Sequence, residues 1–174
     1  VPVDHVYAST IFVPYLKSMN LENLIMASPD TGGTRRAAAY AKFLNTGFVI
    51  CYKQRSKPNQ IGNMELVGDV DGKDVVLIDD MADTAGSITK AGNLIMERGA
   101  KSVRAFCTHP VFSGEAYERI QNSSFEEFIV TDTIPIKPGY DKITVLSTAN
   151  LFSEVISRAL KTKSISSLYQ IKDS

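Results

Sequence analysis

The sequence has little that would mark a secreted protein or one that binds nucleic acid. Of its 174 residues only two are cysteines, and both Cys51 and Cys107 lie inside apolar runs. This usage is typical of buried thiols in a reducing compartment, although a disulfide remains an open alternative. Lys plus Arg and Asp plus Glu each total 19, so the net charge gives no reason to expect nucleic acid or an anionic membrane as a partner.

Long apolar runs, targeting signals and repeats are also missing. The chain has no apolar run near the length of a membrane span, no signal-peptide pattern and no internal repeat. We therefore predict a cytoplasmic protein without a membrane partner. A length of 174 residues, 44% of them hydrophobic, suits one α/β domain with a substantial core. The chain begins at Val1 without a methionine, and we expect it to be an excised segment of something longer.

Short β-branched runs alternate with helical spacings along the chain, which predicts a mainly parallel sheet with helices on both faces. The polar stretch 54–63, which has no periodicity, is expected to be a loop. We expect strands at 1–8, 23–27, 48–52, 64–68, 74–78, 103–107, 128–130 and 143–146. We expect helices around 12–19, 37–44, 88–95, 113–120 (capped by Ser113) and 152–159.

The strongest chemical signal is VVLIDDMADTAGSIT, residues 75–89, where an apolar strand leads through two acids and a loop of small residues into a helix. Small residues let backbone N–H groups approach an anion, and the N-terminus of a helix adds a favourable dipole. Hydroxyls can donate to phosphate oxygens, whereas carboxylates suit sugar hydroxyls or a metal ion. The segment therefore predicts a ribose 5-phosphate site formed by Asp79, Asp80, Asp83, Thr84, Ala85, Gly86 and Ser87.

The alternative is that Asp79 and Asp80 form a solvated turn and that Ser87 only caps the helix. The order of the acids, the small-residue loop and the helix start favours the binding site. The segment resembles the phosphoribosyl pyrophosphate-binding motif of the type I phosphoribosyltransferase fold. The resemblance implies a single domain of that fold over residues 1–174, and it does not separate the members of the superfamily.

A second segment, ASPDTGGTRRAAAYAKFL at residues 27–44, resembles the SPD-x-GG-x-x-RA segment of ribose-phosphate pyrophosphokinases. The resemblance implies that Asp30 helps to hold Mg²⁺, for which a hard carboxylate oxygen is a suitable ligand. Alternatively, Asp30 only caps the following helix. The two roles are compatible.

A third segment, Tyr52-Lys53-Gln54-Arg55, places two cations at alternating positions of a strand end, from which both can grip a polyphosphate. The family resemblance implies that Lys53 and Arg55 are catalytic and that Arg55 also contacts the sugar phosphate. The usual family sequence here is closer to VDKRR. Tyr52 and Gln54 replace its acid and its middle arginine, which changes the charge of this loop. The alternative is that two loop cations only aid solubility.

The remaining similarity carries less chemistry. Residues 99–116 and 128–135 resemble the same family, and we expect His5 and His109 to be structural. The ending SISSLYQI resembles a serine-rich C-terminus that in this family lies near an allosteric nucleotide or phosphate site; a disordered tail is the alternative.

The resemblance covers Val1 to about Tyr169 but only part of the family's length, and it implies a missing N-terminal domain that supplies much of the ATP site. It also implies a homo-oligomer and the Mg²⁺-dependent transfer of the β,γ-diphosphoryl group of ATP to the C1 hydroxyl of ribose 5-phosphate, giving phosphoribosyl pyrophosphate and AMP. We expect the isolated chain to have low or no activity. Two alternatives are a type I phosphoribosyltransferase, for which we find no segment to form a nucleobase hood, and a non-catalytic synthase-associated subunit.

Overall fold

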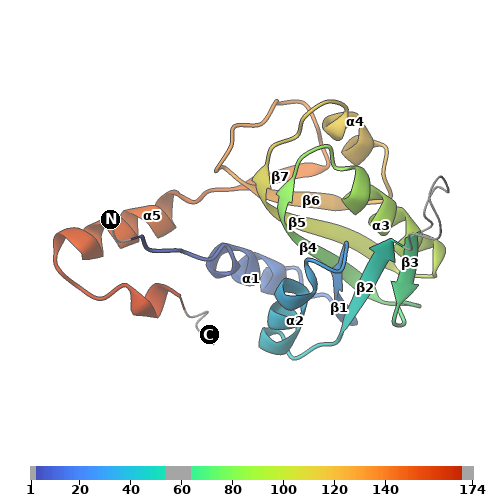
Figure 1. Cartoon of the computed structure of the whole chain (residues 1–174), viewed down its shortest axis with the longest axis horizontal. Coiled ribbons are helices and arrows are strands. Elements are labelled where there is room, and N and C mark those ends of the chain that lie inside the picture. The colour runs from blue at the N-terminus through green and yellow to red at the C-terminus, as the bar shows by residue number, and fades with distance from the viewer. Residues whose placement is uncertain (1–2, 54–63, 170–174) are drawn as a thin grey trace. The chain divides into compact units, whose positions relative to one another are not determined.

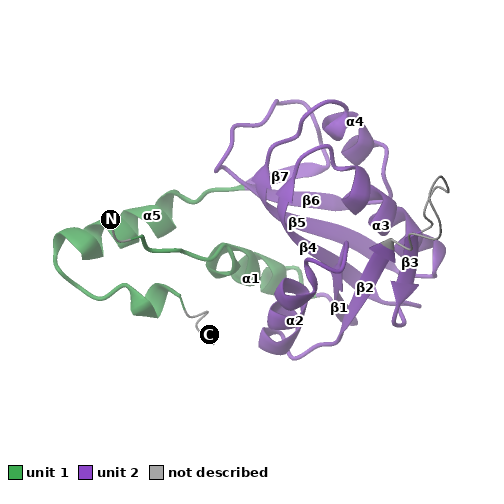
Figure 2. Cartoon of the chain, in the orientation of Figure 1, with its two compact units in different colours: residues 1–20, 146–174 green, residues 21–145 purple. Residues whose placement is uncertain are grey.

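The computed structural model describes residues 3–53 and 64–169 and divides into two compact units. One unit spans residues 21–145, and the other combines residues 1–20 with 146–174 (Figure 2). This division does not test the prediction of a single domain over residues 1–174. None of the helices in the described part is both long and apolar enough to cross a membrane.

The larger unit is built on a seven-stranded sheet with the strand order β3-β2-β1-β4-β5-β6-β7 (Figure 1). Neighbouring strands from β2 through β1, β4 and β5 to β6 pair in parallel, whereas β3 pairs antiparallel with β2. The predicted mainly parallel sheet is therefore confirmed. The strands are β1 (Leu24–Ser28), β2 (Phe48–Lys53), β3 (Met64–Val67), β4 (Asp74–Ala82), β5 (Ser102–Pro110), β6 (Glu127–Thr131) and β7 (Ile143–Leu146).

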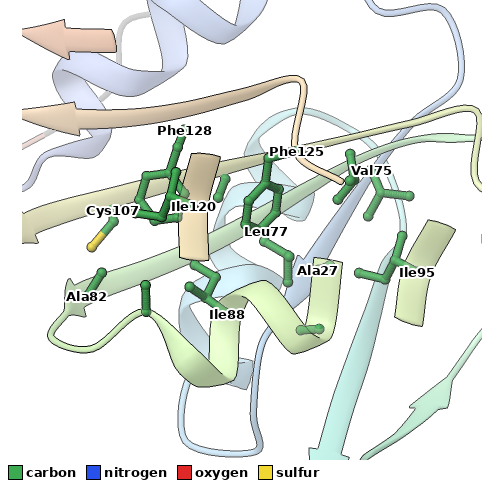
Figure 3. Close-up of a cluster of buried hydrophobic side chains, with 14 of the residues drawn as sticks. Ala27, Val75, Leu77, Ala82, Ile88, Ile95, Cys107, Ile120, Phe125 and Phe128 are labelled. Carbon is green, nitrogen blue, oxygen red and sulfur yellow. The ribbon is translucent and has the colours of Figure 1, made fainter. Parts of the chain in front are cut away.

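One face of the sheet is covered by α3 (Gly86–Glu97) and α4 (Ala116–Gln121). Successive residues of a strand point to opposite faces, so Val75 and Leu77 of β4 share one buried cluster with Ile95 of α3 (Figure 3). Burial of this apolar surface is the main source of stability for the unit. The cluster fixes the position of α3 against the centre of the sheet.

The opposite face is covered by α2 (Thr34–Phe43), which contacts β1, β2 and β4. Val76 and Ile78 of β4 are buried but lie outside the first cluster, as do Ala37 and Tyr40 of α2. Helices therefore lie on both faces of the sheet, as predicted.

α3 packs closely on the cluster because residue 92 is a glycine. A Cβ atom at Gly92 would lie 2.6 Å from Cε1 of Phe125, closer than real Cβ contacts come. A glycine inside a helix costs about 1 kcal/mol relative to alanine, so this position gives up helix stability for close packing.

The smaller unit contains α1 (Ser9–Ser18), α5 (Ala149–Leu160) and the short 3-10 helix η1 (Ser166–Leu168). The helices predicted around 12–19 and 152–159 are thus confirmed. Within this unit, Nη1 of Arg158 donates to Oγ of Ser167 at 2.6 Å. The serine-rich ending includes η1, and the allosteric site suggested for it stays a prediction.

Several element boundaries differ from the sequence prediction, and two of them lie next to the site. The strand predicted at the start of the chain is wrong, because residues 3–8 form no strand. β4 was expected to end at residue 78 but continues to Ala82, because its backbone keeps pairing with β5 as far as Ala82 opposite Pro110. α4 begins at Ala116 rather than at residue 113, and its N-cap residue is Glu115. The prediction that Ser113 caps this helix is wrong, since its hydroxyl donates to the carboxylate of Asp83 instead.

Both cysteines are free and buried, as predicted. Burial raises the pKa of the Cys51 thiol to about 11 and also raises the pKa of Cys107, so both thiols stay protonated and unreactive at neutral pH. The loop predicted at 54–63 lies outside the described residues.

Candidate functional site

The carboxyl end of β4 presents two neighbouring acids whose side chains share one arginine. The side chain of Asp79 is 22% exposed and that of Asp80 is 64% exposed. Nη1 of Arg36 lies 2.8 Å from Oδ1 of Asp79, and its Nη2 lies 2.6 Å from Oδ2 of Asp80. Arg36 comes from α2, which covers the neighbouring strand, so one guanidinium holds both carboxylates at the edge of the sheet.

The two acids differ in their surroundings. Burial raises the pKa of Asp79 to about 6, although the backbone N–H of Asp80 and the charge of Arg36 act in the opposite direction. That N–H donates to Oδ1 of Asp79 at 2.9 Å. Asp79 is therefore an acid whose charge is costly in this fold, a property common at binding and catalytic sites.

The loop that follows β4 leads into α3 through a left-handed residue. Ala85, the N-cap residue of α3, has φ 55° and ψ 7°, a conformation that costs a residue with a Cβ atom about 1 kcal/mol. Among the described residues no side chain caps the start of α3, and the first turn of this helix contains no acid. The first N–H groups of a helix lack partners within the helix, so the start of α3 can accept an anion.

A distant segment, residues 112–119, supports this loop. Backbone N–H groups of Phe112 and Ser113 donate to the carbonyl oxygens of Ala82 and Asp83, each at 3.0 Å. The Ser113 hydroxyl donates to the Asp83 carboxylate. Asp83, a predicted site residue, therefore lies on the loop with its side chain already paired. Arg119 completes the contacts, as its Nη1 donates to the carbonyl oxygen of Thr84 at 2.9 Å.

Asp30 follows β1 at the same edge of the sheet, and its side chain stabilises the start of α2. Its Oδ1 accepts from the N–H of Gly33 at 2.9 Å, while the hydroxyl of Ser28 donates to its carbonyl oxygen at 2.6 Å. The alternative that Asp30 caps α2 is wrong in its strict form, because Gly33 is the N-cap residue and the Asp30 carboxylate only accepts from its N–H.

The carboxylates of this region offer few ligands for Mg²⁺. Over residues 3–53 and 64–169 no group of three or more His, Cys, Asp or Glu side chains could hold a metal ion by itself. Mg²⁺ commonly keeps several waters and binds through one or two carboxylates together with phosphate oxygens of a substrate. The exposed carboxylate of Asp30 suits a Mg²⁺ ion that is bound by one protein carboxylate together with waters and substrate phosphate oxygens.

Lys53 is the last residue of β2, where its backbone pairs with Met64 of β3. Its side chain and the whole of Arg55 lie outside the part that the structure describes. Because β2, β1 and β4 are parallel neighbours, their carboxyl ends share one edge of the sheet. The fold therefore places the backbone of Lys53, Asp30 and the Asp79 pair at the same edge, and the roles predicted for the two cations stay predictions.

Three residues of this region were missed by sequence reasoning. Arg36 is the arginine of the Arg-Ala pair that ends the SPD-x-GG-x-x-RA match, so a signal for it was available. Ser113 was noticed only as a helix cap, and Arg119 had no signal at all.

His109 was expected to be structural, and its contacts fit that role. Nδ1 of His109 lies 3.0 Å from Oγ1 of Thr133, which in turn lies 3.1 Å from the carbonyl oxygen of Thr108. The imidazole thus joins a hydrogen-bond network between the ends of β5 and β6.

Known proteins resemble this chain over nearly its whole length. A family model described as "Phosphoribosyl synthetase-associated domain" matches residues 52–170. The ribose-phosphate pyrophosphokinases of Porphyromonas gingivalis and Wolinella succinogenes are 51% and 49% identical, each over 97% of this chain but only 54% and 55% of their own length. The chain therefore spans about half the length of these curated relatives.

Solved structures agree with this relationship. Phosphoribosylpyrophosphate synthetase from Mycobacterium smegmatis matches with a TM-score of 0.85 at 36% identity, covering 92% of this chain and 53% of that chain. Adenine phosphoribosyltransferase from Saccharomyces cerevisiae matches with a TM-score of 0.53 at 18% identity, covering 66% and 73% of the two chains, which shows the fold alone. The predicted type I phosphoribosyltransferase-like fold is confirmed, and the chain belongs to the ribose-phosphate pyrophosphokinase family.

Proposed function

We propose that this chain supplies the sugar-phosphate-binding half of a ribose-phosphate diphosphokinase, which makes phosphoribosyl pyrophosphate and AMP from ATP and ribose 5-phosphate. One observation carries the proposal: an uncapped helix start preceded by a left-handed residue lies next to two acids at the carboxyl end of β4. A phosphate suits the helix start, and vicinal hydroxyls suit the acids. Ribose 5-phosphate has both groups in one molecule.

The residues divide the work of binding. N–H groups at the start of α3, with the hydroxyls of Thr84 and Ser87, hold the 5-phosphate. The carboxylates of Asp79 and Asp80 accept hydrogen bonds from the ribose hydroxyls. Arg36 pairs with both carboxylates, so their negative charge repels an incoming phosphate less than two free acids would.

The transfer itself depends on alignment and on neutralisation of charge. The C1 hydroxyl oxygen bonds to the β-phosphorus of ATP, the bond from that phosphorus to the oxygen bridging the α-phosphate breaks, AMP leaves, and the hydroxyl proton passes to solvent. Mg²⁺ near Asp30 would neutralise polyphosphate oxygens when bound. We assign Lys53 and Arg55 to stabilising the charge on the moving diphosphoryl group.

Other parts of the proposal depend on the family. Since this chain spans about half of its relatives' length, we propose that much of the ATP site lies in a further domain and that the 174-residue chain alone turns over little or not at all. We also propose that the complete gene product acts in the cytoplasm as a homo-oligomer.

Product analysis tests the reaction directly. The complete gene product should convert ATP and ribose 5-phosphate to AMP and phosphoribosyl pyrophosphate, and calorimetry should show that ribose 5-phosphate binds. Turnover only with a nucleobase and phosphoribosyl pyrophosphate would indicate a phosphoribosyltransferase instead. Binding without turnover in either assay would indicate a non-catalytic subunit.

The Lys53→Ala substitution tests the assignment of the catalytic lysine. In the complete gene product we expect kcat to fall about 100- to 1000-fold, because removing a charge that stabilises only the transition state lowers kcat. The affinity for ribose 5-phosphate should stay nearly unchanged. Lys42→Ala, at an exposed position near the end of α2, is the matched control and should leave kcat unchanged. Normal turnover of Lys53→Ala would remove this residue from the mechanism.

A further inference from the structure

We propose that residues 112–119 form a loop clamp, in which Arg119 is a positioning residue that aims backbone N–H groups of residues 83–85 at the sugar phosphate. The inference rests on the proposed function, because it presumes that these N–H groups meet a phosphate. The sequence segments that suggested the function gave Ser113 no role at the site, and Arg119 lies outside all of them. Both act on the loop from the segment that links β5 to α4 and from α4 itself.

The clamp holds three consecutive carbonyl groups. Those of Ala82 and Asp83 accept from the N–H groups of Phe112 and Ser113 at 3.0 Å, and that of Thr84 accepts from Nη1 of Arg119 at 2.9 Å. In a planar trans peptide the C=O and the following N–H point in opposite directions. Fixing these carbonyls therefore directs the N–H groups of residues 83, 84 and 85 away from the clamp, as a set of adjacent donors suited to an anion.

The clamp also compensates for an unfavourable backbone. Ala85 has φ 55°, and the loop would leave this left-handed conformation readily if its carbonyl partners were lost. On the clamp, Phe112 is itself left-handed, with φ 47°. Its buried ring packs edge-to-face against Tyr117 and Phe128, with ring centroids 5.1 and 5.7 Å apart. The clamp is thus anchored in the core, so it can impose its geometry on the loop.

The contacts of Arg119 suit a residue that holds the loop in place rather than one that attracts the phosphate by its charge. Its Nη2 lies 3.0 Å from Oε2 of Glu115, so the guanidinium has an acidic partner beside it. A Cβ atom at Gly86 would lie 3.7 Å from Nη1 of Arg119, so the guanidinium lies beside the first residue of α3. A residue that acted mainly by attracting phosphate would gain nothing from an acidic partner.

Arg119→Ala in the complete gene product is the first test. We expect the KM for ribose 5-phosphate to rise about five- to tenfold, because a charge-assisted hydrogen bond to the loop is lost, while kcat at saturating sugar phosphate stays within about twofold. Arg98→Ala, at an exposed position at the other end of α3, removes the same charge and should change neither constant. Equal KM values for the two variants would overturn the clamp.

Salt and a conservative variant separate positioning from charge. The ratio of the Arg119→Ala KM to the wild-type KM should be the same in about 0.5 M salt as in low salt. Salt screens the attraction between distant charges, but it does not restore a lost hydrogen bond to the backbone. Arg119→Lys keeps the charge but offers a different donor geometry, so we expect it to recover only part of the affinity. A ratio that falls to one in high salt, or full recovery by lysine, would overturn the positioning role.

Hydrogen exchange tests the clamp without any ligand. The amides of Phe112 and Ser113 should exchange several-fold faster in Arg119→Ala than in Arg98→Ala, since the three contacts act together. If ribose 5-phosphate does not bind the wild-type protein, the proposed function fails while this comparison still decides the clamp. Unchanged exchange at both amides would overturn it.

Discussion

β4 carries acids near both ends, and the acids at the two ends differ in how well neighbouring groups compensate their charge. At the amino end Asp74 is only 3% exposed, and its partners are the first residue of β5 and the residue that precedes it. Its Oδ1 accepts from the hydroxyl of Ser102 at 2.6 Å, and its Oδ2 lies 3.6 Å from Nζ of Lys101. This acid is satisfied within the fold.

At the carboxyl end, Asp79 and Asp80 have to share the guanidinium of Arg36, and burial raises the pKa of Asp79 to about 6. Two adjacent carboxylates repel each other, and one cation compensates only in part. An acid with enough partners thus stabilises the fold, whereas two undercompensated acids at the carboxyl ends of the strands lower its stability, a pattern common at binding sites.

The largest expected effect is on folding, at the amino end. Asp74→Ala should lower the free energy of unfolding by about 2–3 kcal/mol, because it leaves the buried Ser102 hydroxyl without its acceptor. Urea unfolding measures the loss, and binding of ribose 5-phosphate should be unchanged. Asp69→Ala removes an exposed acid that pairs with Lys73 and should have a much smaller effect. Equal losses in the two variants would break the comparison.

A smaller effect, on binding, is expected at the carboxyl end. Asp79→Asn should weaken ribose 5-phosphate binding about 10- to 50-fold, because a charge-assisted hydrogen bond to a ribose hydroxyl is replaced by a weaker one. Its stability at pH 7.5 should be no lower than that of the wild-type protein. Calorimetry and urea unfolding supply the two readouts, and Asp69→Asn is the control. Unchanged affinity would show that Asp79 does not contact the sugar.

The smallest effect is a pH dependence. The pKa of Asp79 is about 6 in the folded protein against an ordinary value of 3.8, so its proton stabilises the folded state at low pH. That stabilisation is complete below about pH 4 and is lost as the pH rises through 6. Asp79→Asn should therefore gain about 1–2 kcal/mol relative to wild type between pH 4.5 and 7.5. A difference that stayed constant over this range would contradict the raised pKa.

Local patterns predicted most of the fold and the loop of the site. Short apolar runs identified each strand of the described residues, but they also predicted a strand at residues 1–8, and residues 3–8 form none. The small residues after Asp80 pointed to the start of α3 because both signals lie within a few residues of each other. The end of β4 was placed too early because two acids suggest a strand end. The ladder with β5 decides where the strand ends, and a single sequence does not show that pairing.

The missed residues act over long separations in sequence. Arg36 and Asp79 are 43 residues apart, and Arg119 and Thr84 are 35 apart. Such contacts leave no periodicity or spacing in the sequence, and only the family-like segment 27–44 marked the position of Arg36. Ser113 was misplaced for a related reason, since a serine before a helix usually caps it and here the carboxylate of Asp83 is the competing acceptor.

The contact between Gly92 and Phe125 has a consequence for the other end of the same helix. A helix is stiff along its axis, and residue 92 lies about 9 Å along it from Gly86, at 1.5 Å for each residue. A methyl group at position 92 would push the helix outward from the sheet and displace its first turn with it. The height of the first amides of α3 above the sheet is therefore set by the absence of one side chain, nearly two turns further along the helix.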